Sequence, residues 1–145
     1  MRIYWILFLL VLSFNVNSGT SPTYACQYTL PLKIQNFLKK HFSQYEIEKL
    51  KYDAKDGDCK VQYKNGIKVE FNQHGYWEEI ESNYAPLPKS IIDILPKPAI
   101  SFIANKYPRK HIIKIKHQSD EYKVKLEGSL ELKFDDQGNI IKIND

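Results

Sequence analysis

The chain has 145 residues, of which 43% are hydrophobic and 26% are charged, and its formal net charge at pH 7 is +4. This length accommodates one compact domain or two small halves that share a core. So small a net charge argues against nucleic-acid binding, which depends on clustered Arg and Lys side chains.

Residues 1–18 have the features of a secretory signal peptide. One charged residue, Arg2, precedes the apolar run from Ile3 to Leu12, which matches a charged n-region followed by a short h-region. The run is shorter than the roughly 20 residues that a membrane-spanning helix needs. Cleavage is predicted after Ser18 or, at the latest, after Ala25. We therefore expect a periplasmic or secreted protein with no stable transmembrane segment after processing.

The chain contains two cysteines, Cys26 and Cys59. Because an exported chain with two cysteines usually pairs them in an oxidising compartment, a disulfide between them is predicted. In the chain-entropy model, closing such a loop stabilises the fold by roughly 3 to 4 kcal/mol. Two other states stay open: a lipid anchor on Cys26, if cleavage falls after Ala25, and two thiols in a reduced protein.

Residues 26–81 are predicted to form a first unit of one helix and four strands. The helix should begin near Thr29 or Leu30, with Pro31 in the first turn, where the missing N–H has no intrahelical partner. The strands alternate apolar and polar residues, and Asn65-Gly66 is a strong hairpin signal. The apolar positions of the helix follow the i, i+3, i+4, i+8 rule of a single stripe: Ile34, Phe37, Leu38 and Phe42.

Residues 82–94 are predicted to be a connector, and residues 95–145 a second unit with the same order of elements. Within the connector, residues 84–88 are stiffened by two prolines, and Ser90–Asp93 resembles a capping box that opens a short helical turn. In the second unit, an apolar-patterned helix ends at Pro108 and alternating strands follow.

The two units match at a nearly constant offset. Leu30-Pro31 corresponds to Leu95-Pro96 at an offset of 65, and the offset is 63 from Val61 onward. The agreement lies at apolar and turn positions, so the feature that repeats is a packing scheme. The predicted fold class is α+β, a tandem repeat of a helix followed by a four-stranded antiparallel sheet, with the helices packed on one sheet face.

The strand alternation predicts that the other sheet face is open, polar and rich in lysine. Two apolar residues, Trp77 and Ile140, are expected there at matching positions, where they would anchor a protein partner. The alternative is a merely solvated face, with Trp77 covering a sheet edge or meeting the other unit. The candidate partner-binding residues are Trp77, Ile140, Lys60, Lys68, Lys123 and Lys133.

The sequence contains no recognisable catalytic or metal-binding motif. HExxH, paired CxxC and GxSxG are all absent. His41 lies next to the stripe of the first helix and His117 follows the inward alternation of a strand, so both are interpreted as structural. Asp53–Asp58 has the residue types of a calcium loop but not its spacing. We therefore predict no enzymatic activity, no metal and no cofactor.

With its repeated motifs in register, the chain resembles the PepSY-like family, whose members are described as beta-lactamase-inhibitor-like proteins. The resemblance implies an exported bacterial protein in which a curved sheet grips a partner, and it brings no catalytic residues. The first unit departs from the pattern at Phe42-Ser43, where Tyr-Pro would be expected, and the two cysteines are not part of it. The motifs are Leu95-Pro96, Tyr107-Pro108, Tyr122–Leu126 and Phe134–Gly138, with their first-unit counterparts.

These observations favour an exported, non-enzymatic binding or inhibitor-like module. It would dock an envelope or extracellular protein on the open sheet face, with the lysines selecting an acidic surface. The alternative is a periplasmic carrier or sensor of a small or lipidic anion, held between the helix and sheet layers or against the lysine face.

Overall fold

The computed structural model describes residues 30–145. The predicted signal peptide, both cleavage sites and Cys26 lie outside the described residues. The elements in chain order are α2 (Leu32–Phe42), β1 (Ile47–Tyr52), β2 (Cys59–Tyr63), β3 (Ile67–Phe71), β4 (Trp77–Ser82), α3 (Lys89–Ile92), α4 (Lys97–Lys106), β5 (Ile112–Gln118), β6 (Glu121–Leu126), β7 (Glu131–Asp135) and β8 (Ile140–Asn144).

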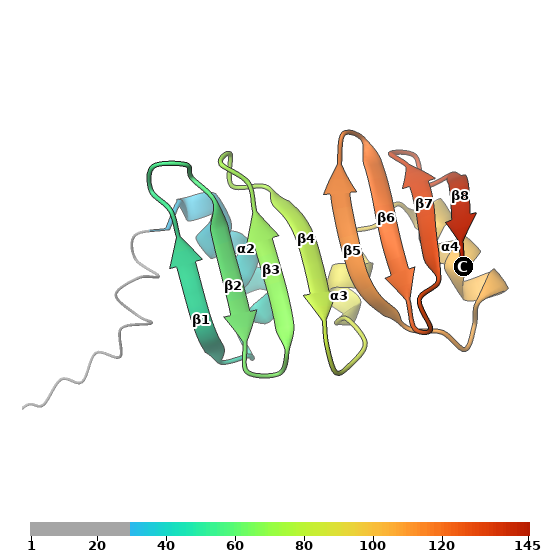
Figure 1. Cartoon of the computed structure of the whole chain (residues 1–145), viewed down its shortest axis with the longest axis horizontal. Coiled ribbons are helices and arrows are strands. Elements are labelled where there is room, and N and C mark those ends of the chain that lie inside the picture. Colours follow the sequence, from blue (N-terminus) through green and yellow to red (C-terminus); the bar gives the residue numbers. More distant parts are fainter. Residues whose placement is uncertain (1–29) are drawn as a thin grey trace, which may run out of the picture.

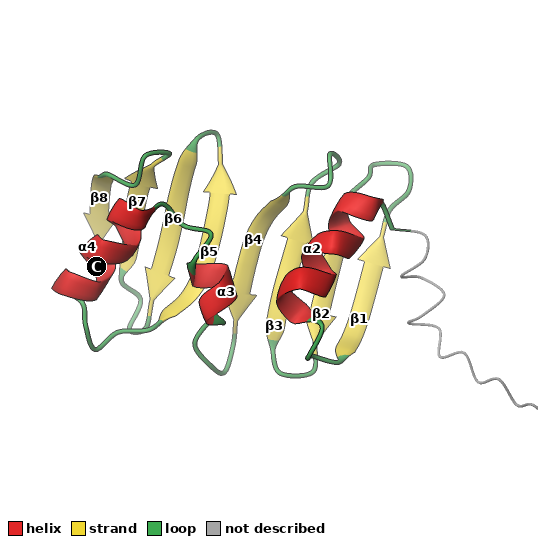
Figure 2. Ribbon diagram, turned by 180° about the vertical axis from the view of Figure 1, so that it is seen from behind, coloured by secondary structure: helices red, strands yellow, loops and turns green. Residues whose placement is uncertain are grey.

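The strands form one open, eight-stranded antiparallel sheet in which each strand pairs with the next along the chain (Figure 1). The predicted four-stranded sheets are therefore joined into one. The joint is the β4–β5 ladder, where Ile80 lies opposite Ile115. The helices of residues 30–145 lie on one face of the sheet, with α2 over β1 to β3, α4 over β7 and β8, and α3 at the joint of β4 and β5 (Figure 2). The fold class is α+β, as predicted.

The predicted stripe attaches α2 to the sheet. Ile34, Leu38 and Phe42 are each at most 3% exposed, and the half-buried Phe37 meets Phe71 of β3 edge-on, with 5.5 Å between ring centroids. Burying each such large apolar side chain stabilises the fold by about 1.5–3 kcal/mol before conformational entropy is subtracted.

The other two helices dock in related ways. In α4, Ala99 and Ile103 are buried, and Phe102 meets Phe134 of β7 edge-on at 5.8 Å. The short helix α3 lies where a helical turn was predicted, and it buries Ile91 completely. Its N-cap is Pro88 and it has no side-chain cap, so the predicted capping box is wrong.

The turn between β7 and β8 passes directly beneath the start of α4. Gly138 has φ +87°, and a Cβ added there would lie 2.8 Å from the Cβ of Pro96 and 2.9 Å from the backbone nitrogen of Ala99. Only glycine fits this conformation and this space without a shift. The helix and the β7–β8 hairpin are thereby held at a fixed spacing.

Four of the seven ladders contain a β-bulge, where an extra residue interrupts the period-two alternation of side chains. The register shifts lie between Ile47 and Lys49 in β1, between Ile112 and Lys114 in β5, between Glu70 and Phe71 opposite β4, and between Lys133 and Phe134 opposite β8. These interruptions decide which side chains reach the open face.

Candidate functional site

Two rows of side chains cross the open sheet face, because residues directly opposite in a ladder point to the same side. No residue of either row is apolar. The first row is Lys51, Lys60, Glu70, Glu79, Lys116, Lys123, Lys133 and Lys142. The second row is Lys49, Gln62, Lys68, Glu81, Lys114, Lys125, Glu131 and Asn144.

The apolar alternation of the strands places these rows. In β2 the buried residues are Cys59, Val61 and Tyr63, and in β7 they are Leu132 and Phe134, so the residues between them face away from the helices. Four predicted partner-binding lysines lie in the two rows: Lys60, Lys68, Lys123 and Lys133.

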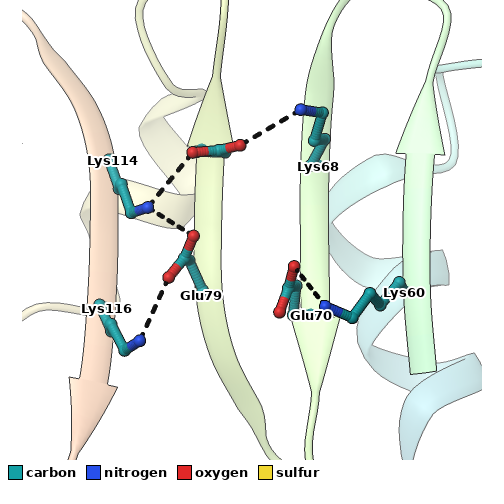
Figure 3. Close-up of polar contacts among 7 residues, drawn as sticks. Lys60, Lys68, Glu70, Glu79, Lys114 and Lys116 are labelled. Carbon is teal, nitrogen blue, oxygen red and sulfur yellow. Dashed lines mark hydrogen bonds and ion pairs between the residues drawn. The ribbon is translucent and has the colours of Figure 1, made fainter. Parts of the chain in front are cut away.

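Ion pairs neutralise the part of the face that lies over β2 to β4 (Figure 3). The ammonium of Lys60 lies 3.0 Å from the carboxylate of Glu70, and that of Lys68 lies 3.4 Å from Glu81. The hydrogen bond from Lys60 to Glu70, together with the charge of Glu70, raises the pKa of Lys60. Lys60 and Lys68 are therefore engaged within the chain.

Glu79 of β4 is the least exposed carboxylate of this network, with 18% of its side chain exposed. It lies 2.5 Å from the ammonium of Lys114 and 3.4 Å from that of Lys116, both on β5. Burial raises the pKa of Glu79, but the hydrogen bonds and charges of the two lysines outweigh burial and lower it overall. Because Lys114 also reaches Glu81 at 3.3 Å, the network links β4 to β5 across the joint of the sheet.

The other end of the first row consists of four lysines on four successive strands. We call Lys116, Lys123, Lys133 and Lys142 the lysine row. Each member lies directly opposite the next. Lys116 reaches Glu79, and Lys133 lies 2.5 Å from Glu121. Within residues 30–145, Lys123 and Lys142 make no ion pair.

A hollow of about 120 Å³ lies at the start of the lysine row, at the β5–β6 hairpin. Its lining is Lys116, Gln118, Ser119, Glu121 and Lys123. The hairpin turns through two residues, Ser119 and Asp120, which both have positive φ, 50° and 63°. Positive φ at both central positions is the geometry of a type I′ turn, which matches the twist of the two strands. The tight turn thus holds the lining residues of β5 and β6 at a fixed separation.

The predicted apolar anchors do not lie on the open face, and this part of the prediction is wrong. The bulge opposite Phe71 adds one residue to β4, so Trp77 pairs with the buried Phe71 and not with an open-face residue. The bulge opposite Phe134 does the same in β8, where Ile140 pairs with Phe134. Both side chains therefore point to the helix-covered side.

On that side, Trp77 belongs to an aromatic cluster with His117 and Tyr122. The Trp77 ring lies 5.6 Å from that of His117 and 6.5 Å from that of Tyr122, and the last two rings stack at 4.4 Å. Burial, and then the charge of Asp136, raise the pKa of Tyr122. His117 packs as the structural residue that the alternation predicts.

The predictions on cysteines and metals concern the remaining candidate residues. Cys59 is fully buried, and its predicted disulfide partner Cys26 lies outside the described residues. Over residues 30–145, no group of three or more His, Cys, Asp or Glu side chains is arranged to hold a metal ion. In the loop after β1, the Asp53 carboxylate accepts hydrogen bonds from the backbone N–H groups of Lys55 and Asp56, at 2.9 and 3.3 Å. Asp53 thus acts as a turn former.

No described helix is long and apolar enough to cross a membrane.

A protein family described as "Putative beta-lactamase-inhibitor-like, PepSY-like" matches residues 57–142. The chain belongs to this family. It is a family of unknown function rather than a known enzyme family. No curated protein matches the chain.

Three crystal structures of Bacteroides proteins share the family fold. A "putative calcium-regulated periplasmic protein" from Bacteroides thetaiotaomicron is 33% identical, with a TM-score of 0.72, over 82% of this chain and 93% of that one. Two "putative periplasmic" proteins from Bacteroides vulgatus are also similar. The first is 32% identical, with a TM-score of 0.70, over 82% of this chain and 93% of that one. The second is 29% identical, with a TM-score of 0.69, over 81% of this chain and 94% of that one. The predicted periplasmic or secreted location is thereby confirmed.

Proposed function

We propose that the chain is an exported, non-enzymatic binding module that docks a protein partner on its open sheet face. The observation that carries the proposal is the position of the helices. In the described part of the chain, α2, α3 and α4 lie on one side of the sheet, and no described element covers the other side (Figure 2). Strands in a sheet lie about 4.8 Å apart, so eight strands present a face about 34 Å wide. The two rows supply sixteen polar residues, to be compared with about 20–30 residues per partner in a specific interface.

A face of this composition would bind mainly by charge. With no apolar residue in either row, the interface lacks the buried aromatic anchor that dominates most protein–protein affinities. Charged faces instead speed association and select partners by complementarity, and both effects weaken as salt is added. The proposal therefore implies a fast, salt-sensitive association and not a permanent complex.

We infer further that the two halves of the sheet are copies of one ancestral unit. The bulges support this inference, because the shift at Ile47 and Lys49 has its counterpart 65 residues later at Ile112 and Lys114. The shift opposite β4 recurs 63 residues later, opposite β8. These are the two offsets at which the apolar residues of the sequence repeat.

Site-specific photo-crosslinking in the periplasm tests the docking face. A photoreactive residue replaces Lys60, whose side chain is 62% exposed on the open face. The matched control replaces Lys40, an exposed residue of α2 on the helix side. We expect protein adducts from position 60 and none from position 40. Equal adducts from both positions, or adducts from position 40 alone, would contradict the proposal.

A second candidate function, a carrier or sensor of a small anion, is favoured only by the hollow beside Lys116 and Lys123. The space between the layers offers it little support, because the residues packed there are apolar and buried, Ile34, Ile91 and Ile115 among them. Thermal-shift measurements separate the two functions. A carrier gains stability from phosphate, acetate or a fatty acid alone, whereas a docking module gains it from a protein or peptide.

A further inference from the structure

We propose that the lysine row is a binding stripe for carboxylates, and that the partner presents an acidic segment of Asp and Glu side chains to it. This inference rests on the proposed docking function. It narrows the partner to a chemical class and places the acidic segment of that partner at one end of the face. Its four members, Lys116, Lys123, Lys133 and Lys142, belong to four adjacent strands. Over about 14 Å of sheet, therefore, a lysine recurs on each strand, about every 4.8 Å.

The fold alone does not explain this arrangement. Like charges placed directly opposite each other in a sheet destabilise it, and the lysine row contains three such contacts in succession. Carboxylates relieve the repulsion only at Lys116, through Glu79, and at Lys133, through Glu121. Lys123 therefore lies between two other lysines without an ion pair of its own in the described chain.

The first half of the sheet shows that the scaffold accepts another pattern. At the offsets of the internal repeat, Lys51 and Lys60 correspond to Lys116 and Lys123. Two glutamates, Glu70 and Glu79, stand at the positions that correspond to Lys133 and Lys142. The same strand positions thus carry two cations and two anions in one half, but four cations in the other. In the first half, Lys60 is paired with Glu70. In the second half, Lys123 and Lys142 make no ion pair within residues 30–145 and are available to a partner.

The hollow at the β5–β6 hairpin supplies one defined binding site for a carboxylate. It lies between Lys116 and Lys123, and Ser119 and Gln118 add neutral hydrogen-bond donors to its lining. Glu121 also lines the hollow, but its carboxylate is held by Lys133 at 2.5 Å. A carboxylate at this site would relieve the repulsion between the two lysines, and further carboxylates would lie along the row.

An acidic protein segment fits this stripe better than a membrane does. Peripheral binding to anionic lipid generally combines cations with apolar side chains that enter the acyl layer, and neither charged row contains an apolar residue. The three structural neighbours are described as "putative" periplasmic proteins, and nucleic acid is not normally available to exported proteins.

The test uses a fluorescent ten-residue glutamate peptide, with a ten-residue glutamine peptide as the neutral probe. Fluorescence anisotropy at low salt is compared for the wild type, for the double variant Lys133→Glu with Lys142→Glu, and for Lys60→Gln. The double variant gives the second half the charge pattern of the first, so we expect it to fold. We expect it to bind the glutamate peptide at least about tenfold more weakly than the wild type. Lys60→Gln should bind within about twofold of the wild type, because Lys60 is engaged by Glu70.

Thermal melting without peptide supplies the second readout. The double variant replaces the repulsion between Lys123 and Lys133 by an attraction, but it loses the ion pair of Lys133 with Glu121. Lys60→Gln loses the ion pair with Glu70. Both variants should therefore melt close to the wild type, which shows that a loss of peptide binding is not a loss of folding. The proposal is overturned if the wild type ignores the glutamate peptide, if the double variant and the wild type bind it equally, or if Lys60→Gln loses as much affinity as the double variant. If the protein binds vesicles containing phosphatidylglycerol more tightly than the peptide, the partner is a membrane and not an acidic protein. If acetate alone stabilises the protein as much as the peptide does, the site binds single carboxylates and not an acidic segment.

The proposed function and this inference can fail separately. If position 60 still forms protein adducts in the double variant, docking on the open face is supported and the role of the lysine row is refuted. If position 60 forms no adducts but peptide binding depends on Lys133 and Lys142, the carboxylate-binding role of the lysine row is supported and docking across the whole face is refuted.

Discussion

Trp77 lies directly opposite Phe71 across the β3–β4 ladder. Phe71 packs against Phe37 of α2, so the indole of Trp77 lies on the helix-covered side, where it meets His117. β4 begins at the end of the sheet away from α3 (Figure 1). The aromatic cluster of Trp77, His117 and Tyr122 therefore covers sheet surface that the short helix leaves uncovered. We assign it to the stability of the sheet and not to the docking face.

Replacing Trp77 by Ala should destabilise the fold and spare binding. Truncating a fully buried Trp costs about 3–5 kcal/mol, and Trp77 is half-buried, so we expect a loss of about 2 kcal/mol in the free energy of unfolding. Urea denaturation measures this loss, with Leu32→Ala, at a 70% exposed position, as the control that should change little. If the Trp77→Ala protein keeps its stability but no longer binds the glutamate peptide, Trp77 belongs to the binding surface and the assignment to stability is wrong.

The sequence predicts the faces of the sheet wherever a strand is regular. Val61 and Val124 are inward by alternation, and both are at most 1% exposed. The buried side of each helix is equally predictable, because the spacing of its apolar residues is fixed by the helical pitch. Alternation fails at the bulges, since a single extra residue such as Glu78 reverses the direction of Trp77 and nothing in the sequence marks the insertion.

The lysine row shows a second limit of the sequence. Lys116, Lys123 and Lys142 can each be assigned to the open face from their own strands. That they stand directly opposite one another depends on the registers of three ladders, which in turn depend on turn lengths and bulges. The joining of the two units through Ile80 and Ile115 was likewise not predictable, because the edge of a four-stranded unit looks the same whether or not another strand pairs with it.

The ion pairs of Glu79 make part of the stability dependent on acid pH. The pKa of Glu79 is lower in the folded chain than in the unfolded chain, so this contribution is fully present above the ordinary carboxyl pKa of about 4.3. It is lost as the pH falls through the folded-state pKa. Glu79→Gln should lower the free energy of unfolding at pH 7 by about 1 kcal/mol and flatten its decline below pH 5. Glu78→Gln, at the exposed neighbour in the bulge, serves as the control, and equal effects of the two variants would contradict the assignment.

His41 should make the fold sensitive to mild acid. Its side chain lies in α2 beside Phe37, its residue is 5% exposed, and its Nδ1 has no hydrogen-bond partner. Burial, and then the charge of Lys40, lower the pKa of His41 in the folded chain. Below the ordinary value of about 6.5 the unfolded chain takes up a proton that the folded chain resists, so stability falls as the pH drops from 6.5 toward the folded-state pKa. The variant His41→Leu should lose this slope between pH 7 and 5, while His111→Leu, at an exposed position, should keep it. Denaturation midpoints at several pH values decide between these outcomes.

The disulfide between Cys26 and Cys59 stays a prediction that the position of Cys59 supports. Cys59 begins β2 at the end of the sheet near the start of α2, because the neighbouring Gly57 lies against Gln73, and Gly75 of the same turn lies against Ile34. Leu30 is already buried there, and the four residue steps from Leu30 to Cys26 can span up to about 14 Å. A bond between the two sulfurs would therefore fasten the segment before α2 to the sheet and stabilise the fold by about 3 kcal/mol.

Peptide mapping of the periplasmic protein without reducing agent should recover one fragment that contains both cysteines. In denaturation experiments, Cys26→Ser, Cys59→Ala and the double variant should then lose similar amounts of stability, because each removes the same bond. Should Cys59→Ala destabilise the fold while Cys26→Ser does not, the effect of Cys59 would come from its packing among the buried residues of the first half. If the intact mass instead shows a lipid on Cys26, the cysteine is a membrane anchor and the predicted disulfide does not form.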